Sequence, residues 1–267
     1  ALQIRILMID SVTSERDTTK TSAASDIART WGGHQYVAGP FLVVPYDQFV
    51  GLDKDKKPMY IERLAVVSPD QLDVAANVDS ETRYRGIFEV PIFTTALKLS
   101  GRFDAGDFQE FRTDNNKVHW KDSYLALGIS DTKALVGEAQ LTVDGAQAEF
   151  LPWKGELEFL RAGIVSPTPQ LKGAKEGLSF ATELTLRGSG MAQFQPAGKN
   201  TAVALTSDWP HPSFLGAFLP DEREISEKGF TAKWGINYLS RNYPKVWTDA
   251  ADRVNLYDTY FGVSLYS

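Results

Sequence analysis

The sequence predicts a mainly β fold of the antiparallel β-sandwich type, arranged as one sandwich or as two lobes, with an N-terminal helix. Three observations predict it. Many segments alternate apolar and polar side chains with a period of two, Gly, Pro, Asp or Asn bound most of them, and helical windows are scarce after residue 33. Strands this frequent favour packed antiparallel sheets over alternating strand and helix units.

Residues 1–31 are predicted to form one long, weakly amphipathic helix or two shorter ones. A series with a mostly polar middle recurs at steps of three or four from Ile9 to Trp31, and Gly32 and Gly33 supply the residue type that ends helices. The apolar run over residues 1–9 is too short to span a membrane. It is either the end of a helix that emerges from a bilayer or the apolar face of an amphipathic helix.

From residue 34 onward the sequence has the pattern of strands. Asp144-Gly145 lies between two alternating segments, and both residue types tolerate the positive φ of a tight hairpin turn, so those segments are expected to pair antiparallel. Short helices are expected at residues 107–111, 213–218 and 237–241. The predicted strands lie at residues 41–46, 60–67, 85–90, 95–103, 119–129, 139–143, 180–186, 230–236 and 261–265.

The predicted organisation is an N-terminal helix over residues 1–33 followed by a β domain over residues 34–267. Residues 164–177, rich in Pro, Gly and Lys, form the best linker-like stretch. They either divide two β lobes or form a long loop of one sandwich. Residues 53–58, with three lysines and a proline, are expected to form a solvated hairpin tip.

Composition excludes several classes of partner and chemistry. Acidic side chains outnumber basic ones by 34 to 28, giving a formal charge of -6, so a nucleic-acid partner is not expected. The absence of cysteine excludes disulfides, thiol catalysis and thiolate metal sites, although it assigns no compartment.

The sequence presents no recognisable catalytic or metal-binding set. His34, His119 and His211 are far apart and form no zinc signature, so neither a metal nor a cofactor is expected. Ser207 and Asp208 lie close to His211, but there is no GxSxG elbow, and Asp208 is expected to accept backbone hydrogen bonds in a turn. We therefore expect a protein that is not an enzyme.

A glycan-binding or glycan-processing module is the alternative. Glycoside hydrolysis needs only two carboxylates at the right separation, and the chain has 34 Asp and Glu side chains. Six tryptophans could stack on sugar rings, although tryptophans in β proteins more often pack in the core.

Residues 206–220 form the least ordinary stretch, with three prolines, three aromatic rings and a histidine. Each proline fixes its own φ and disfavours helix at the residue before it. The stretch is either a structural corner between sheets or an exposed apolar ledge for a partner. The candidate ledge comprises Trp209, His211, Phe214, Leu215 and Phe218, with Arg223 and Glu224 as a charged rim.

The same stretch carries a family resemblance. Residues 205–220 (LTSDWPHPSFLGAFLP), followed by Arg223-Glu224, Ser226, Gly229-Phe230 and Trp234, closely resemble the CreD family of bacterial inner membrane proteins. The early run over residues 39–45 (GPFLVVP) matches the same family's opening strand. The order of prolines and rings makes the long motif highly specific.

The resemblance covers essentially the whole chain and implies the periplasmic domain of such a protein in a Gram-negative bacterium. It implies that residues 1–9 continue a first membrane helix and that residue 267 lies shortly before a second. The family is associated with cell-envelope integrity, with sensitivity to envelope-directed agents and with the CreBC two-component system. It supplies no catalytic residues, so we expect a non-catalytic domain whose partner is an envelope protein or a glycan.

Overall fold

The computed structural model describes residues 25–266 except 110–111, 114, 154–159, 161, 170, 172–176, 249–253 and 255. Residues 25–31 form a helix, as predicted. The rest of the predicted N-terminal helix, including the apolar run over residues 1–9, lies outside the described residues. Across the part of the chain that is described, no helix is both long and apolar enough to cross a membrane.

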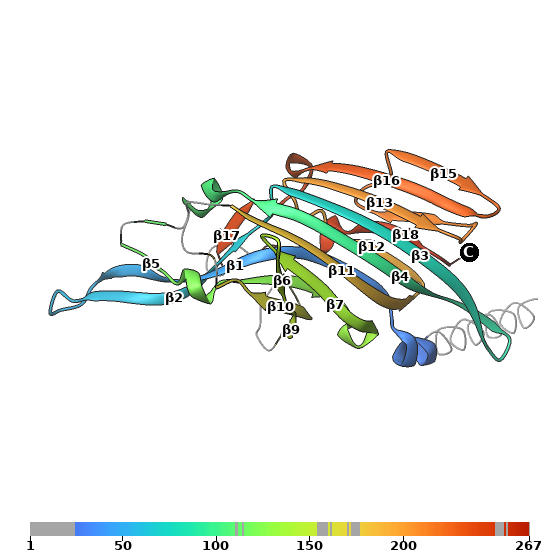
Figure 1. Ribbon diagram of the computed structural model, residues 1–267, viewed down its shortest axis with the longest axis horizontal. Coiled ribbons are helices and arrows are strands. Elements are labelled where there is room, and N and C mark those ends of the chain that lie inside the picture. The colour runs from blue at the N-terminus through green and yellow to red at the C-terminus, as the bar shows by residue number, and fades with distance from the viewer. Residues whose placement is uncertain are drawn as a thin grey trace, which may run out of the picture.

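The described strands form two sheets (Figure 1). The ten-stranded sheet runs in the order β14-β18-β12-β1-β6-β10-β9, while β2 and β5 pair with β1 and β17 pairs with β2. Its strands are β1 (Gln35–Leu52), β2 (Pro58–Val67), β5 (Lys117–Val118), β6 (Tyr124–Ile129), β9 (Leu151–Pro152), β10 (Gly163–Pro167), β12 (Met191–Phe194), β14 (Ser213–Gly216), β17 (Val246–Thr248) and β18 (Phe261–Ser264).

The eight-stranded sheet runs in the order β15-β16-β13-β3-β4-β11-β7-β8. Its strands are β3 (Gln71–Arg85), β4 (Phe88–Phe103), β7 (Leu135–Val143), β8 (Ala146–Ala148), β11 (Leu178–Ser189), β13 (Asn200–Ser207), β15 (Glu222–Ser226) and β16 (Gly229–Asn237). All its pairs are antiparallel except β13 with β3.

The two sheets share one hydrophobic core. Along β3, β11, β13 and β16 buried and exposed residues alternate, so this sheet turns one face to the core and the other to solvent. In the other sheet, β1 is buried almost continuously from Gln35 to Tyr46, which shows that its central part is covered on both faces. Buried side chains of both sheets belong to a single cluster. The prediction of a mainly β sandwich is confirmed.

Several local predictions can be compared with the structure. The turn at Asp144-Gly145 is confirmed: both residues have positive φ, and Val143 pairs with Ala146 across it. The helix expected at residues 213–218 is wrong, because Ser213–Gly216 pairs with β18 as a strand. The strand expected at residues 85–90 is interrupted by a turn at Gly86, whose φ is +62°.

Short 3-10 helices connect the strands. η4 lies within the short helix predicted at residues 237–241, and η1 overlaps the one predicted at residues 107–111. Their bounds are η1 (Ala105–Gln109), η2 (Trp120–Asp122), η3 (Thr132–Ala134), η4 (Tyr238–Ser240) and η5 (Tyr257–Thr259).

Each sheet contains strands from both sides of residues 164–177. Strands that precede this stretch pair directly with strands that follow it, as β4 does with β11 and β1 with β12. The suggested sub-boundary there stays a prediction.

Two hairpins extend beyond the strands that flank them. In the first, which we call the arm, residues 48–64 of β1 and β2 pair with each other beyond the points where β5 and β17 pair. In the second, which we call the ribbon, residues 79–91 of β3 and β4 continue past the ends of β13 and β11. The two hairpins project at opposite ends of the molecule (Figure 1).

Candidate functional site

The predicted ledge lies in a connection that crosses between the sheets. The chain leaves β13 in the eight-stranded sheet, forms β14 at the edge of the ten-stranded sheet and returns to the first sheet as β15. Two carboxylates hold this crossing. Asp208 Oδ1 accepts the Ser80 N–H at 2.8 Å, and Asp221 Oδ2 accepts the Gly235 N–H at 2.7 Å.

The aromatic side chains of the ledge turn largely toward the core. Phe214 makes T-shaped contacts with Phe230 and Trp234, with ring centroids 5.5 and 5.9 Å away. Phe218 makes such a contact with Phe261 at 6.0 Å, and its carbonyl accepts the Trp234 Nε1–H. Both rings are half-buried, so they close the open edge of the sandwich.

The remaining predicted residues lie around this packing. Trp209 and Leu215 are half-buried, and the indole of Trp209 donates to the carbonyl of the exposed His211. Among the rim residues, the Arg223 guanidinium lies over the Phe214 ring at 6.0 Å, while Glu224 is exposed on β15. The structure thus brings the predicted ledge and rim together, and the role of the ledge in binding stays a prediction.

The Ser207 hydroxyl and the Asp208 carboxylate, both close to His211 in the sequence, accept hydrogen bonds from backbone N–H groups. Ser207 Oγ accepts the Trp209 N–H, and Asp208 accepts the Ser80 N–H. Asp208 accepts a backbone hydrogen bond, as expected, but the donor lies 128 residues away on β3 rather than in a local turn.

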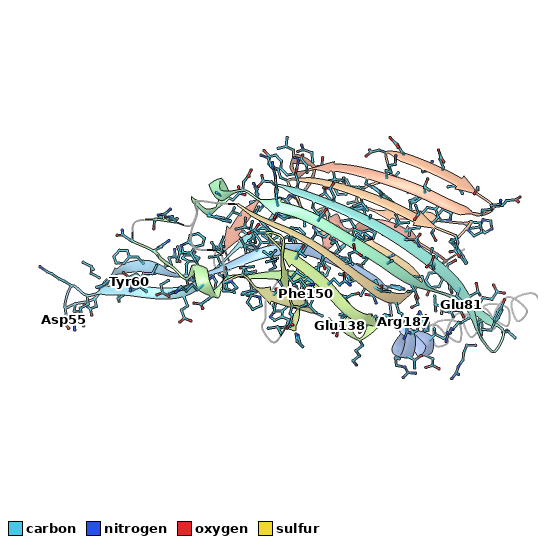
Figure 2. All side chains as sticks on the ribbon, in the orientation of Figure 1. Asp55, Tyr60, Glu81, Glu138, Phe150 and Arg187 are labelled. Atoms are coloured by element: carbon cyan, nitrogen blue, oxygen red, sulfur yellow. The ribbon has the colours of Figure 1, made fainter. Side chains whose placement is uncertain are left out.

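The arm exposes a set of aliphatic side chains that the sequence analysis did not single out. One part of its base is covered, because the Lys117 ammonium lies 3.9 Å from the Tyr60 ring centroid and Asn116 Oδ1 accepts the Phe49 N–H. Figure 2 places Tyr60 along the arm and Asp55 at its tip. The exposed aliphatic side chains are Val50, Leu52, Met59 and Ile61.

The tip of the arm is solvated, as predicted. Asp53 Oδ1 accepts the N–H groups of Asp55 and Lys57, and Lys56 adopts a positive φ of 61°. Charged residues and Pro58 at this end are the features with which exposed strands avoid indiscriminate pairing.

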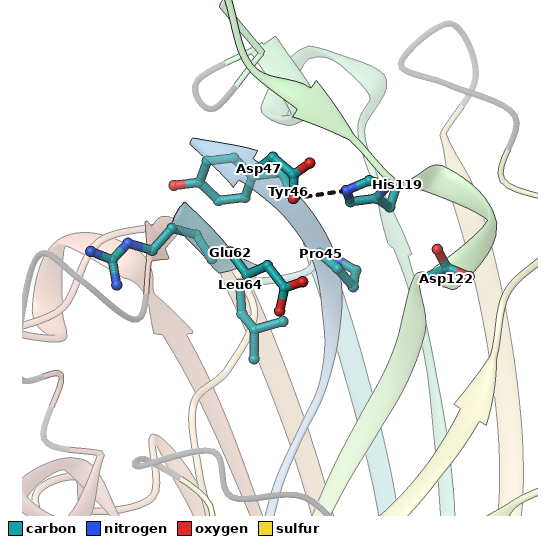
Figure 3. A pocket seen from close by; sticks show the side chains of 8 residues that line it. Pro45, Tyr46, Asp47, Glu62, Leu64, His119 and Asp122 are labelled. Carbon is teal, nitrogen blue, oxygen red and sulfur yellow. Dashed lines mark ion pairs between the residues drawn. The ribbon is translucent and has the colours of Figure 1, made fainter. Parts of the chain in front are cut away.

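An open pocket of about 560 Å³ lies at the base of the arm (Figure 3). Its ionisable side chains come from separate elements, and His119 Nε2 lies 3.1 Å from Asp47 Oδ1. Sequence reasoning missed this pairing because 72 residues separate the two positions (119 − 47) and no motif joins them. The lining residues are Pro45, Tyr46, Asp47, Glu62, Arg63, Leu64, His119 and Asp122.

The pocket carries more negative than positive charge. Asp47, Glu62 and Asp122 contribute three carboxylates, against the guanidinium of Arg63 and the titratable imidazole of His119. Within the described residues, no three or more His, Asp or Glu side chains are grouped as a metal ion would require.

A second charged group lies between β3, η1 and the segment before β17. Lys245 Nζ lies 2.5 Å from Asp70 Oδ1 and 2.6 Å from Asp107 Oδ1. Burial raises the pKa of Asp107 above its ordinary value despite this ion pair. Burial also acts to raise the pKa of Asp70, but Lys245 and the Asp104 N–H together hold it below its ordinary value.

A family model described as inner membrane protein CreD matches residues 1–267. The chain is 29% identical over 243 residues to inner membrane protein CreD of Escherichia coli (strain K12). That alignment covers 90% of this chain and 53% of the relative, so the chain spans about half the length of the curated relative it matches.

Among solved structures, the chain matches an M1 zinc metallopeptidase from Deinococcus radiodurans with a TM-score of 0.32 and 10% identity. It also matches a mutant two-domain M1 zinc metallopeptidase bound to L-arginine with a TM-score of 0.34 and 9% identity. Each alignment covers 74% of this chain and 42% of the other chain. At such low scores these likenesses carry no argument about fold or function.

Proposed function

The chain belongs to the CreD family of inner membrane proteins, and we propose that it is a non-catalytic periplasmic domain that supports cell-envelope integrity. In this proposal the domain is held at the membrane through both ends of the chain and binds another envelope protein through the arm. The observation that carries the proposal is the set of exposed aliphatic side chains on the arm, Val50, Leu52, Met59 and Ile61.

Anchoring through both ends agrees with the way the described chain begins and ends. The Ser189 N–H donates to the Gly33 carbonyl, and the Leu265 N–H donates to the Gly190 carbonyl. Residues 33 and 265 are therefore fastened to the same turn, between β11 and β12. A domain whose two ends lie together at one side is suited to rise from a single membrane surface, with the arm at the far end (Figure 1).

The chemistry of the arm favours a protein partner. Aliphatic side chains are exposed on both strands of the arm. Burying them against another apolar surface is favourable by about 25 cal/mol for each Å² of apolar area removed from water. Within the described residues, β17 pairs with β2 only at Ala65–Val67, so the backbone of residues 58–63 offers an edge to which an extended segment can add.

Photocrosslinking in living cells tests this contact. A photoreactive residue at Met59 or Ile61 of the full-length membrane protein is expected to yield a discrete crosslinked protein. Ile225 is the matched control, since it is an exposed isoleucine on β15. Positions Phe214 and Phe218 test the ledge in the same experiment. Crosslinks from the ledge alone would move the contact there, and silence at the arm would overturn the arm as the binding surface.

A functional assay accompanies the crosslinking. Replacing Leu52 and Ile61 by serine should raise the sensitivity of cells to envelope-directed agents while protein abundance stays unchanged, because both side chains are exposed. The same change at Ile225 should leave sensitivity at the level of the unmodified protein. Equal sensitivity of all three strains would contradict a role of the arm in envelope integrity.

The pocket at the base of the arm motivates a second candidate, a glycan-binding module. It brings three carboxylates and His119 around one opening, which are groups that can hydrogen-bond sugar hydroxyls. No tryptophan is among its lining residues. Calorimetry with peptidoglycan fragments tests this candidate: heat of binding that disappears in Asp47→Asn would support it, and no heat in the unmodified protein would reject it.

A further inference from the structure

The tip of the ribbon combines exposed apolar side chains with arginines. Ile87 is 76% exposed and Tyr84 is 68% exposed. Arg83 and Arg85 flank Tyr84, and Arg85 pairs with Phe88 across the turn at residues 86–87. No neighbouring strand among the described residues pairs with residues 79–91, so the tip stands clear of the sandwich.

The ribbon lies beside the part of the chain that leads into the domain. The Arg83 guanidinium carbon lies 4.3 Å from the Trp31 ring centroid, and Arg85 Nη2 lies 3.5 Å from Asp26 Oδ2. Trp31 Nε1 also donates to the carbonyl of Phe93 on β4. The helix over residues 25–31 is thereby fixed along the ribbon, from Phe93 near its base to Arg85 next to its tip (Figure 1).

The end of the described chain lies at the same end of the molecule. The rings of His34 and Tyr266 contact each other edge to face, with centroids 6.3 Å apart. Figure 1 shows the C-terminal end, the helix and the ribbon together, opposite the arm, and Figure 2 places Glu81 and Arg187 at this end.

We propose that the tip of the ribbon inserts Tyr84 and Ile87 into the phospholipid headgroup layer of the membrane that carries the protein. The proposal rests on the proposed anchoring through both ends of the chain, which sets the membrane beyond this end of the domain. The ribbon projects toward that surface (Figure 1).

The chemistry of the tip fits this boundary. A tyrosine ring places an apolar body and a polar hydroxyl at the level of lipid headgroups, and the transfer of an isoleucine side chain out of water is favourable. Arginine can lay its stem along apolar surface and keep its guanidinium near lipid phosphate. Asp26 and Glu81 each pair with one of the two arginines, so the tip is not a strongly basic patch. We therefore expect the tip to bind the headgroup layer of neutral as well as anionic lipids.

Such a contact gives the domain a third point of attachment besides its two chain ends. Two attached ends allow the domain to tilt about the line that joins them, whereas a third point restricts that tilt. The ribbon would therefore fix the direction in which the arm projects from the membrane.

The absence of cysteine in this chain allows single labelling sites. We would prepare the full-length protein, with any cysteine outside this chain replaced by serine, carrying Ile87→Cys labelled with an environment-sensitive fluorophore. Leu52→Cys and Met59→Cys, at exposed positions on the arm at the opposite end of the molecule (Figure 1), are matched controls. The labelled proteins are reconstituted into vesicles of phosphatidylcholine alone and into vesicles that also contain phosphatidylglycerol.

The probe at position 87 is expected to emit at shorter wavelength than both control probes and to be quenched by lipids that carry a nitroxide near the headgroup. Quenching in both kinds of vesicle supports contact with the interface, and quenching only with phosphatidylglycerol supports contact led by Arg83 and Arg85. Tyr84→Ser should reduce the quenching at position 87 without changing either control.

Flotation of the vesicles separates the two proposals. Protein that floats with the vesicles while its probe at position 87 behaves like the controls would overturn the insertion of the tip and leave the anchoring standing. Protein that fails to float would overturn the anchoring, and with it the insertion that rests on it.

Discussion

The guanidinium carbon of Arg83 lies 4.3 Å from the centroid of the Trp31 ring, and that of Arg187 lies 4.5 Å from the same ring. Trp31 belongs to the helix over residues 25–31, whereas the arginines belong to β3 and β11. The contact therefore joins the segment that enters the domain to two strands of the eight-stranded sheet. We expect a movement of this helix to be transmitted to the eight-stranded sheet through the Trp31 indole ring.

Replacing Trp31 tests the strength of this connection. Trp31→Leu removes two cation–π contacts, each worth about 0.5–1 kcal/mol at a partly exposed site, and the hydrogen bond to Phe93. We expect the free energy of unfolding, measured by denaturant titration, to fall by about 1–3 kcal/mol. Trp31→Phe keeps a ring and should cost less, so equal losses in the two variants would contradict a contribution from the cation–π contacts.

The ion pairs of Lys245 predict a dependence of stability on pH. The pKa of Asp70 is lowered in the folded state, mainly by Lys245 and against burial, so its contribution is present above the ordinary carboxyl pKa of about 4 and is lost as pH falls through the lowered value. Asp70→Asn should therefore lower the free energy of unfolding near neutral pH by about 1–3 kcal/mol. The difference in the free energy of unfolding between Asp70→Asn and the unmodified protein should become smaller at acidic pH.

The contribution of Asp107 to stability should change with pH in the opposite direction. Burial raises its pKa in the folded state, so its contribution is present at low pH and is lost as pH rises through the raised value. Relative to the unmodified protein, Asp107→Asn should become more stable as pH rises over that window. Denaturant titrations over a series of pH values measure both variants, and parallel curves for the two would contradict this assignment.

A glycine at the start of β16 is required by close approach of backbone. Gly229 has a φ of +123°, and a Cβ atom there would lie 2.0 Å from the Ser207 carbonyl oxygen. Gly229→Ala is expected to lower the melting temperature strongly, or to abolish folding, because backbone on β13 would have to move. Gly106→Ala is the matched control, since nothing lies within 4 Å of its added Cβ, and it should be neutral or slightly stabilising.

The strands were predictable where a local pattern determined them. Alternation in Phe180, Leu184 and Leu186 follows from a sheet with one face in the core, and the positive φ of Asp144 and Gly145 follows from residue types that tolerate it. The pairing of β13 with β3 and the crossing of the ledge segment between sheets depend on contacts distant in the sequence. No local pattern reports such contacts.

The same distinction explains the strand at Ser213–Gly216. Its short apolar run with a glycine is compatible with a helical turn, and only the ladder with β18 decides for a strand. The pocket was missed for a related reason, since Asp47 and His119 meet only because β5 and the start of η2 return to β1. Residues of the ledge were found because prolines and rings are visible in the sequence itself.

The packing of the ledge leads to a last prediction, which separates a structural corner from a binding surface. Phe214 is half-buried against Phe230 and Trp234, so Phe214→Ala should lower the free energy of unfolding by about 1–3 kcal/mol, less than the 3–5 kcal/mol typical of a fully buried phenylalanine. Leu219 directly follows Phe218 of the ledge and is 65% exposed, so Leu219→Ser should change that free energy by less than about 0.5 kcal/mol. Denaturant titration measures both changes.

Envelope sensitivity of cells that carry the same two variants completes the comparison. A corner that only closes the sandwich predicts that Leu219→Ser cells resist envelope-directed agents as well as unmodified cells, because the fold is intact. A binding ledge predicts that the exposed Leu219 matters although stability does not change. Loss of resistance in Leu219→Ser with an unchanged free energy of unfolding would therefore assign the ledge a contact of its own, beside that of the arm.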